Sequence, residues 1–181
     1  MTEIRPARPD DLEPLIAIHN HWVRHSVATL DAEPNTAESR RPWFESFAST
    51  GPHRLLVAVS DGRVVGCASS GRYREHPAFA GTVEFGIQLD PECRGAGIGS
   101  DLYRRLIEEL RSEPVHMAVA GIVLPNDASI ALHRRFGFRE VGVFREYAVK
   151  NGALVSALWM QRSLDGEADG GEAGDPAGTS S

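Results

Sequence analysis

The most informative segment of the chain reads Val83-Glu84-Phe85-Gly86-Ile87-Gln88-Leu89-Asp90-Pro91-Glu92-Cys93-Arg94-Gly95-Ala96-Gly97-Ile98-Gly99-Ser100-Asp101-Leu102-Tyr103. It passes from an apolar strand through a glycine-rich turn into an amphipathic helix. Glycine accepts backbone conformations that are closed to other residues and lets the backbone approach a ligand closely. The unpaired amide groups at the start of a helix point at an anion bound there. The segment therefore predicts a cradle for a phosphate group, most naturally a pyrophosphate.

The spacing of this turn differs from two better-known phosphate-binding loops. A Walker loop needs Lys followed by Ser or Thr after its last glycine, but Gly99 is followed by Ser100 and Asp101. A dinucleotide-binding fingerprint reads Gly-x-Gly-x-x-Gly, but this turn reads Arg94-x-x-Gly97-x-Gly99. Taken alone, a Gly-x-Gly at a strand-to-helix junction is more often a tight turn than a ligand site, so both interpretations stay open here.

Two segments together resemble the coenzyme-binding motifs of the GNAT superfamily of acetyltransferases. The turn Arg94-x-x-Gly97-x-Gly99 is similar to the acetyl-CoA signature Gln/Arg-x-x-Gly-x-Gly/Ala. Residues 124–138 are similar to the second coenzyme-side motif, in which Asn126 and Ser129 open a helix that ends at a Gly-Phe turn. The resemblance implies an N-acetyltransferase that uses acetyl-CoA as co-substrate and no metal.

The resemblance is closest to the phosphinothricin acetyltransferase branch of that superfamily. It runs through residues 18–22, 82–84 and 124–127, and it covers roughly residues 3 to 164. We therefore expect residues 1–164 to form one acetyltransferase domain. Residues 165–181 carry five acidic and no basic side chains and lack large apolar ones, which predicts a disordered acidic tail.

The pattern of apolar residues predicts an α/β (α+β) fold, in which a central mixed sheet of about six to seven strands is flanked by helices on both faces. Asp61-Gly62 between two apolar runs indicates a hairpin. Strands are expected at 4–7, 54–60, 63–70, 82–89, 115–123, 139–144 and 155–161, and helices at 9–26, 36–47, 97–111 and 127–136.

Composition excludes several classes of partner. The net charge of -6 is carried largely by the acidic tail, so the rest of the chain is nearly neutral and has no basic nucleic-acid face. No run of about eighteen apolar residues and no signal peptide is recognisable, which predicts a cytoplasmic protein without membrane contact. Cys67 and Cys93 lack Cys-x-x-Cys spacing, so neither a zinc site nor a disulfide framework is supported.

Glu84 is the candidate general base. Attack on a thioester requires a neutral amine, and a nearby carboxylate can accept the proton that the amine must lose. Glu84 lies between Val83 and Phe85 on an apolar strand, where a carboxylate is costly unless it is paired or functional. The resemblance implies the same role, because the glutamate assigned as base in that branch stands seven residues before a proline, as Glu84 does before Pro91. The alternative is a Glu that pairs with a neighbouring arginine or histidine.

His133 is the candidate general acid. A coenzyme A thiolate, whose thiol has a pKa of about 8.5, departs more easily when a proton is supplied. Many GNAT enzymes carry a tyrosine four residues after the serine of the second motif, and the phosphinothricin branch has a histidine there, as at His133. A packed or capping histidine on a helix face is the alternative.

The resemblance implies that the pantetheine arm of the coenzyme lies along the strand at residues 87–89, where a backbone amide faces the thioester oxygen. Asn126 is also a favoured helix cap. The predicted coenzyme-binding residues are Ile87, Gln88, Leu89, Arg94, Gly95, Ala96, Gly97, Ile98, Gly99, Ser100, Asn126 and Ser129.

The acceptor is expected to be a small primary amine, either an amino acid or an analogue. Candidate substrate-binding residues are His19, Asn20 and His21 near the end of the first helix, together with Arg74, His76, Phe79 and Lys150. Relatives often read Phe-Arg-x-Arg-x-Ala-Tyr, so His76 and Phe79 replace an arginine and a tyrosine, and Leu154 and Ser156 replace a later Trp and Asp. Because an Arg clamps a carboxylate or phosphinate in a way that His cannot, we expect phosphinothricin itself to be a poor substrate.

Two other functions remain open on the sequence. One is an acetyltransferase that acts on a protein N-terminus or lysine, which would need an open groove. The other is a non-catalytic acyl-CoA-binding module, against which Glu84 argues. The resemblance to this family implies a homodimer.

Overall fold

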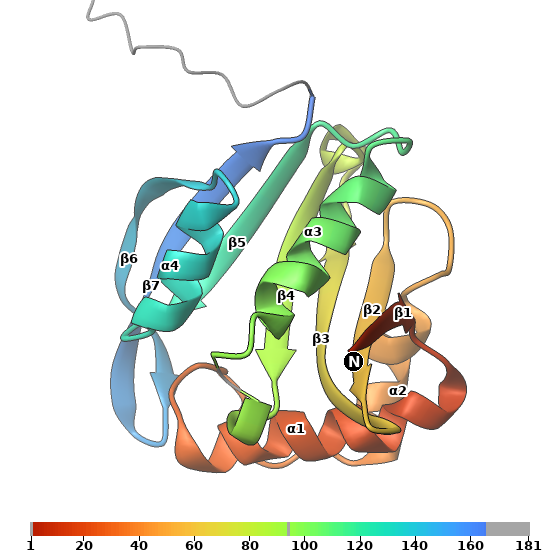
Figure 1. Cartoon of the computed structure of the whole chain (residues 1–181). Helices are drawn as coiled ribbons and strands as arrows, with labels where there is room; N and C mark the ends of the chain where they lie inside the picture. The colour runs from red at the N-terminus through yellow and green to blue at the C-terminus, as the bar shows by residue number, and fades with distance from the viewer. Residues whose placement is uncertain (1, 94, 166–181) are drawn as a thin grey trace, which may run out of the picture.

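The structure, a computed structural model, describes residues 2–93 and 95–165. A seven-stranded sheet forms its centre, in the order β1-β2-β3-β4-β5-β7-β6 (Figure 1). Neighbouring strands are antiparallel except for the parallel pair β4 and β5. The prediction of a mixed sheet is confirmed. The strands are β1 (Glu3–Pro6), β2 (Arg54–Ser60), β3 (Arg63–Arg72), β4 (Thr82–Leu89), β5 (Met117–Val123), β6 (Arg139–Lys150) and β7 (Ala153–Ser163).

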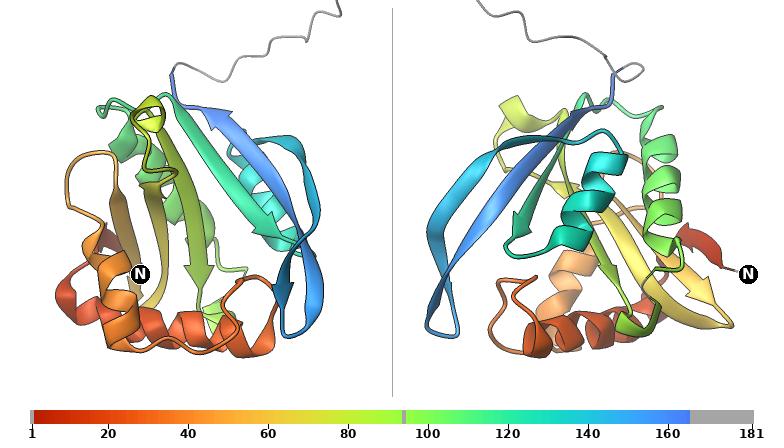
Figure 2. Two further views of the ribbon diagram at one scale, coloured as in Figure 1. Left: turned by 180° about the vertical axis from the view of Figure 1, so that it is seen from behind. Right: turned by 60° about the vertical axis from the view of Figure 1, so that its left-hand side comes forward.

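Helices cover both faces of the sheet. The helices α3 (Ile98–Leu110) and α4 (Asp127–Arg135) lie on one face, whereas α2 (Ala37–Glu45) lies on the other and α1 (Leu12–His25) runs along one end (Figures 1 and 2). Short 3₁₀ turns at Pro9–Asp11, Pro77–Phe79 and Pro91–Cys93 complete the elements.

Alternation along the strands explains this layering. Successive side chains of a strand point to opposite faces, and on β2 Leu56 joins the core under α3 while Leu55 and Val57 join a second cluster with Leu15 of α1. Both faces of the sheet are therefore apolar and require cover. In the part of the chain that the structure describes, no helix is long and apolar enough to cross a membrane.

Local sequence signals are largely confirmed, and the differences lie at the ends of elements. The hairpin at Asp61-Gly62 joins β2 to β3, and both residues have positive φ. The helix expected at 36–47 ends earlier, at Glu45. The strand expected at 139–144 is wrong in length, because β6 continues to Lys150 through an irregularity where Glu146 takes a left-handed conformation. The expected tail falls outside the described residues except for Asp165.

One irregularity of the sheet creates the site. The strands β4 and β5 pair only from Thr82↔Met117 to Glu84↔Val119. Beyond this point β4 stays paired with β3 as far as Leu89, and β5 stays paired with β7 as far as Val123. The two strands therefore separate after Glu84, as Figure 1 shows.

Candidate active site

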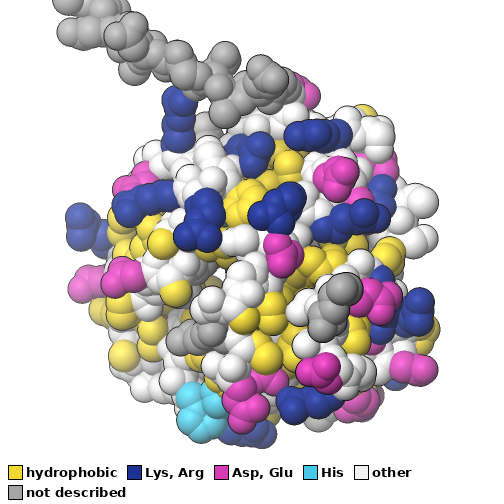
Figure 3. Space-filling model, viewed as in Figure 1, with side chains coloured by type: hydrophobic (Ala, Val, Ile, Leu, Met, Phe, Trp, Pro, Cys, Tyr) yellow, Lys and Arg dark blue, Asp and Glu magenta, His cyan; other side chains and the backbone are white. Residues whose placement is uncertain are grey.

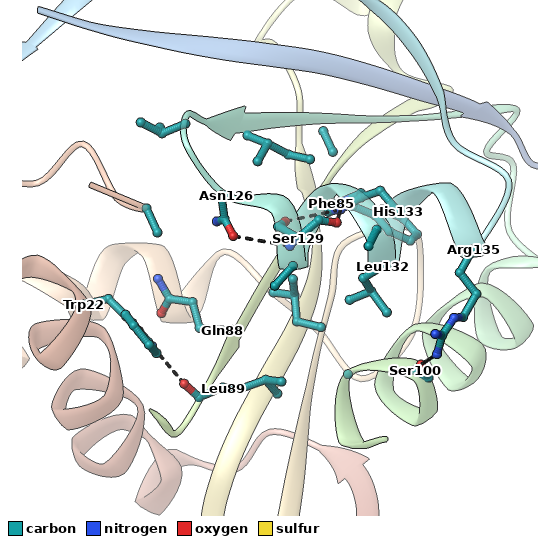
Figure 4. Close-up of a pocket in the computed structure, with 18 of the residues that line it drawn as sticks. Trp22, Phe85, Gln88, Leu89, Ser100, Asn126, Ser129, Leu132, His133 and Arg135 are labelled. Atoms are coloured by element: carbon teal, nitrogen blue, oxygen red, sulfur yellow. Dashed lines mark hydrogen bonds between the residues drawn. The ribbon is translucent and has the colours of Figure 1, made fainter. Parts of the chain in front are cut away.

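A cavity of about 450 Å³ occupies the gap between β4 and β5 (Figure 4). Its walls come from both separated strands, from the glycine-rich turn before α3 and from α4. Lys and Arg side chains gather on the face of the molecule that α3 and α4 cover (Figure 3), and the exposed Arg135 of α4 lines the cavity. A narrow, largely apolar slot beside free helix amides and basic side chains suits a ligand with an extended arm and an anionic end.

The glycine-rich turn has the backbone that its sequence predicts. Gly95 and Gly97 have φ of +80° and +82°, values that residues with a side chain rarely adopt, and Gly97 is the N-cap of α3. Gly99 is buried against the strand, because a Cβ there would lie 3.3 Å from Ile87 Cδ1. Of the predicted coenzyme-binding residues in this turn, Gly95, Gly97, Gly99 and Ser100 line the cavity, while Ala96 is not part of its wall and Ile98 packs in the core. Arg94 lies outside the described residues.

The start of α4 forms the opposite wall of the cavity. Asn126 caps this helix, because its side-chain oxygen accepts a hydrogen bond from the backbone N–H of Ser129 at 3.3 Å (Figure 4). Both residues line the cavity. The predicted capping role of Asn126 is confirmed, and its contact with a coenzyme stays a prediction.

The free edge of β4 carries backbone amides toward the gap. The N–H of Asp90 donates to Val65 O of β3 at 2.9 Å. Because amides along a strand alternate between its two edges, the N–H groups of Ile87 and Leu89 point away from β3, toward the gap. The carbonyl of Leu89 is already used there, since it accepts a hydrogen bond from Trp22 Nε1 at 2.8 Å (Figure 4).

His133 lies in the cavity wall, with both ring nitrogens held by the protein. Its Nδ1 lies 2.7 Å from Ser129 O and its Nε2 lies 2.8 Å from the hydroxyl of Tyr103. The carbonyl requires a proton on Nδ1, so Nε2 is the acceptor and the Tyr103 hydroxyl the donor. Burial lowers the pKa of His133, although the bond to Ser129 opposes this, and burial raises the pKa of Tyr103. The imidazole is therefore neutral near pH 7, and the nearest O–H proton on its Nε2 side belongs to Tyr103.

Glu84 occupies the last paired position before β4 and β5 separate. Val83 and Phe85 pack into the core beneath α3, so Glu84 faces the opposite side of the sheet, the side of α1 and α2. Its half-buried position raises the pKa of the carboxyl, and the charge of Arg74 partly offsets this. Among the described residues, no hydrogen bond or ion pair holds the side-chain carboxylate of Glu84, whose backbone pairs with β3 and β5.

The segment after β3 contributes an aromatic cluster near Glu84. The guanidinium carbon of Arg74 lies 5.1 Å from the ring centre of Tyr73 and 5.9 Å from that of Phe79. His76 is exposed, and its Nδ1 accepts the backbone N–H of Ala78, so it caps the short turn at Pro77–Phe79. The structure therefore places Arg74 and Phe79 together and gives the His76 ring a local capping contact.

Two of the predicted acceptor-binding residues hold the connection between α1 and α2, residues 26–36. His19 is buried, and its Nε2 lies 2.7 Å from Asp31 Oδ2 while its Nδ1 lies 2.8 Å from Gln88 Nε2. The side chain of Asn20 binds both the N–H and the C=O of Asn35. The polar atoms of both side chains are thus used within the protein, and contact with an acceptor stays a prediction.

Lys150 reaches the same connection from the end of β6. It is buried, and its Nζ donates to the carbonyls of Ser26 and Thr29, each at 2.7 Å. By contrast, the ring of His21 stacks on that of His25 at 4.5 Å. The structure therefore gathers His19, Asn20 and Lys150 around residues 26–36 and leaves His21 beside them.

The sequence did not mark every residue that lines or borders the site. Tyr103 stands in the apolar stripe of α3, and its hydroxyl, which needs a partner when buried, was a usable signal. Arg135 lines the cavity with its Nη1 3.3 Å from Ser100 Oγ, and an arginine at the end of a helix beside a phosphate cradle is a second signal. No feature of the sequence pointed to Trp22 Nε1.

Comparisons with known proteins agree with this geometry. The family model described as "Acetyltransferase (GNAT) family" matches residues 17–138. A phosphinothricin N-acetyltransferase of Streptomyces coelicolor is 44% identical over 164 residues, which cover 90% of this chain and 96% of the relative. An L-methionine sulfoximine/L-methionine sulfone acetyltransferase of Pseudomonas aeruginosa is 36% identical over 90% of this chain and 94% of the relative.

Solved structures are similar over nearly their whole length. A phosphinothricin acetyltransferase of Sinorhizobium meliloti in complex with acetyl-CoA has a TM-score of 0.84 at 28% identity, covering 97% of each chain. A ribosomal-protein-alanine N-acetyltransferase of Brucella melitensis has a TM-score of 0.82 at 37% identity, covering 89% of this chain and 99% of the other.

Proposed function

Since the chain belongs to the acetyltransferase (GNAT) family and is an acetyl-CoA-dependent N-acetyltransferase, we propose that its acceptor is the primary amine of a small molecule. The acceptor class we propose is an amino acid or an amino-acid analogue of the phosphinothricin or methionine sulfoximine type. The names of the two relatives described above support this choice.

The observation that carries the proposal is the position of Glu84 at the point where β4 and β5 separate. The cavity lies in the gap just beyond Glu84, and the carboxyl faces the side of the sheet away from α3. A thioester delivered through the cavity and an amine held beside Glu84 would therefore meet at the gap.

Acetyl-CoA would occupy the cavity as a substrate. The turn at residues 95–100 offers free backbone amides and the start of α3 to its pyrophosphate. The edge of β4 offers the amides of Ile87 and Leu89 to the pantetheine arm, as a strand edge binds a peptide. Arg135, which lines the cavity next to Ser100, adds a positive charge near the phosphates.

Each proton of the transfer has a candidate group. Glu84 would accept a proton from the amine, whose nitrogen then attacks the thioester carbonyl. An amide at Ile87 or Leu89 would donate to the oxygen on which negative charge develops. As the C–S bond breaks, the thiolate would take a proton by way of His133, which lines the cavity, and the proton that the attacking nitrogen loses on forming the amide would replace it. The Tyr103 hydroxyl, which donates to Nε2, would position the ring.

Thiol release from acetyl-CoA tests the proposal directly. The assay compares amino acids, phosphinothricin, methionine sulfoximine, methionine sulfone and short peptides, with an enzyme-free control. We expect turnover on at least one small amine and a weaker response to phosphinothricin than to methionine derivatives.

Two results would overturn the proposal. Turnover on peptides alone would assign the chain to protein acetylation, which the similarity to the ribosomal-protein-alanine enzyme makes the main rival. No turnover on any acceptor, with acetyl-CoA binding still measurable by calorimetry, would indicate a binding module.

A homodimer is part of the proposal. β6 is an edge strand, and it exposes apolar side chains that a monomer would leave in water, among them Val141, Phe144 and Val149. Leu154 of β7, which pairs with Val149, is exposed as well. Light scattering at several concentrations measures the mass, and a monomer at all of them would refute this part.

A further inference from the structure

The indole N–H of Trp159 is buried without a hydrogen-bond partner in the part of the chain that the structure describes. Trp can only donate at this atom. Because native proteins pair the great majority of their buried polar groups, an unpaired donor calls for an explanation such as a ligand that completes it.

Trp159 lies on the same side of the sheet as Glu84. It pairs with Gly121 of β5, and Glu84 pairs with Val119, two residues before Gly121. Residues two apart on a strand share a face, and so do residues directly opposite each other on paired strands. The strand of Trp159 is the second from that of Glu84, a separation of about 10 Å at the usual strand spacing.

Gly121 fixes the orientation of the indole. A Cβ at this position would lie 3.1 Å from Cζ2 and 3.2 Å from Cε2 of the Trp159 ring, so the ring rests directly on the β5 backbone. Gly121 is also part of the cavity wall. The indole therefore packs against a residue of the cavity wall, on the face of the sheet that carries Glu84.

Two aromatic rings lie beside the indole of Trp159. The ring centre of Trp159 lies 6.0 Å from that of Tyr73 and 6.1 Å from that of Phe144, and Arg74 lies over Tyr73. Apolar walls suit an aliphatic side chain, whereas the unpaired N–H suits an oxygen atom on it. These groups would therefore suit an aliphatic side chain that ends in a hydrogen-bond acceptor.

We propose that Trp159 determines acceptor specificity by donating its indole N–H to an oxygen on the side chain of the amino acid whose amine lies at Glu84. This rests on the proposed function. A sulfone, which has two acceptor oxygens, is then preferred to the thioether of the same skeleton, because the thioether leaves the N–H unpaired.

A direct competition between L-methionine sulfone and L-methionine tests this role. With both acceptors in one reaction, the ratio of the two acetylated products by mass spectrometry gives the ratio of their kcat/KM values. Trp159→Phe keeps an aromatic ring and removes the N–H. We expect it to lower the sulfone-to-methionine ratio about tenfold, through a loss on the sulfone alone. Trp43→Phe on α2 is the matched control, and its ratio should equal that of the wild type.

The outcomes separate the inference from the function on which it rests. If the sulfone-to-methionine ratio were unchanged in Trp159→Phe, the N–H would have no contact with the acceptor. If kcat/KM fell equally for both acceptors, the ring would act through packing alone. Either result would overturn the inference. Turnover of neither acceptor by the wild type would also overturn the inference, and the wider acceptor panel would then test the small-molecule function separately. The KM for acetyl-CoA and the melting temperature of the variant show whether the fold is intact.

Discussion

Replacing Glu84 with Gln should remove most of the catalytic rate and leave coenzyme binding intact. The amide keeps the size of the side chain but cannot accept a proton from the amine. Glu84 points away from the core beneath α3, and it is not part of the cavity wall where acetyl-CoA is proposed to bind. The substitution should therefore act on the chemical step alone.

General-base catalysis contributes about 10² to 10⁴ in rate, so kcat should fall by this factor. The pH dependence gives a second measure. Burial raises the pKa of Glu84 while Arg74 opposes the rise, so the wild-type rate should fall on acidification at a pH above the ordinary carboxyl value of about 4.3. The Gln variant should lack this acidic limb, because it has no carboxyl to protonate.

Thiol release at saturating acetyl-CoA measures kcat, and calorimetry measures the Kd of the coenzyme. Glu75→Gln is the matched control. The Glu75 side chain is 93% exposed, and the substitution makes the same chemical change nine residues before Glu84. The control should stay within about twofold of the wild type. If Glu84→Gln kept kcat within tenfold, or lost coenzyme affinity in proportion to its rate, the assignment of Glu84 as the base would be wrong.

Two further predictions concern buried groups of the site. The pKa of His133 is lowered in the folded state, so on acidification the unfolded chain binds this proton first. The free energy of unfolding should therefore decrease below about pH 6.5, by up to about 1.4 kcal/mol per pH unit. Denaturant titrations from pH 5 to 7 should show a weaker pH dependence of this free energy in His133→Asn than in the wild type, and an equal pH dependence would contradict the prediction. Lys150→Met removes the hydrogen bonds to Ser26 O and Thr29 O, so it should lower the free energy of unfolding by about 1–3 kcal/mol. If the variant instead kept its stability and had a raised KM for the acceptor, the result would support contact between Lys150 and the acceptor.

Elements whose geometry is local could be read from the sequence. The turn at Asp61-Gly62 and the left-handed Gly97 before α3 depend on the conformational freedom of one or two residues. The cap at Asn126 depends on a contact three residues away. The end of β6 was missed because the strand continues past the irregularity at Glu146, whose N–H binds Ser156 Oγ on the neighbouring strand.

The predicted acceptor-binding residues illustrate the limit of that approach. His19 and Lys150 have the chemistry of ligand-binding side chains, and no local pattern distinguishes a ligand from a distant part of the chain. His19 binds Gln88, and Lys150 binds carbonyls more than 120 residues earlier in the sequence. Such partners become visible only when the chain is folded.

The amino-acid sequence alone indicated the fold, the glycine-rich cradle and the candidate base, because periodicity, backbone freedom and a carboxylate on an apolar strand are properties of neighbouring residues. Only the tertiary structure places the separation of β4 and β5 after Glu84, the pairing of Tyr103 with His133, and the unpaired indole of Trp159 on the face of Glu84. Each of these depends on the register between strands or on packing between elements far apart in the chain. Register and packing are set by burial of the whole core, so no single segment encodes them.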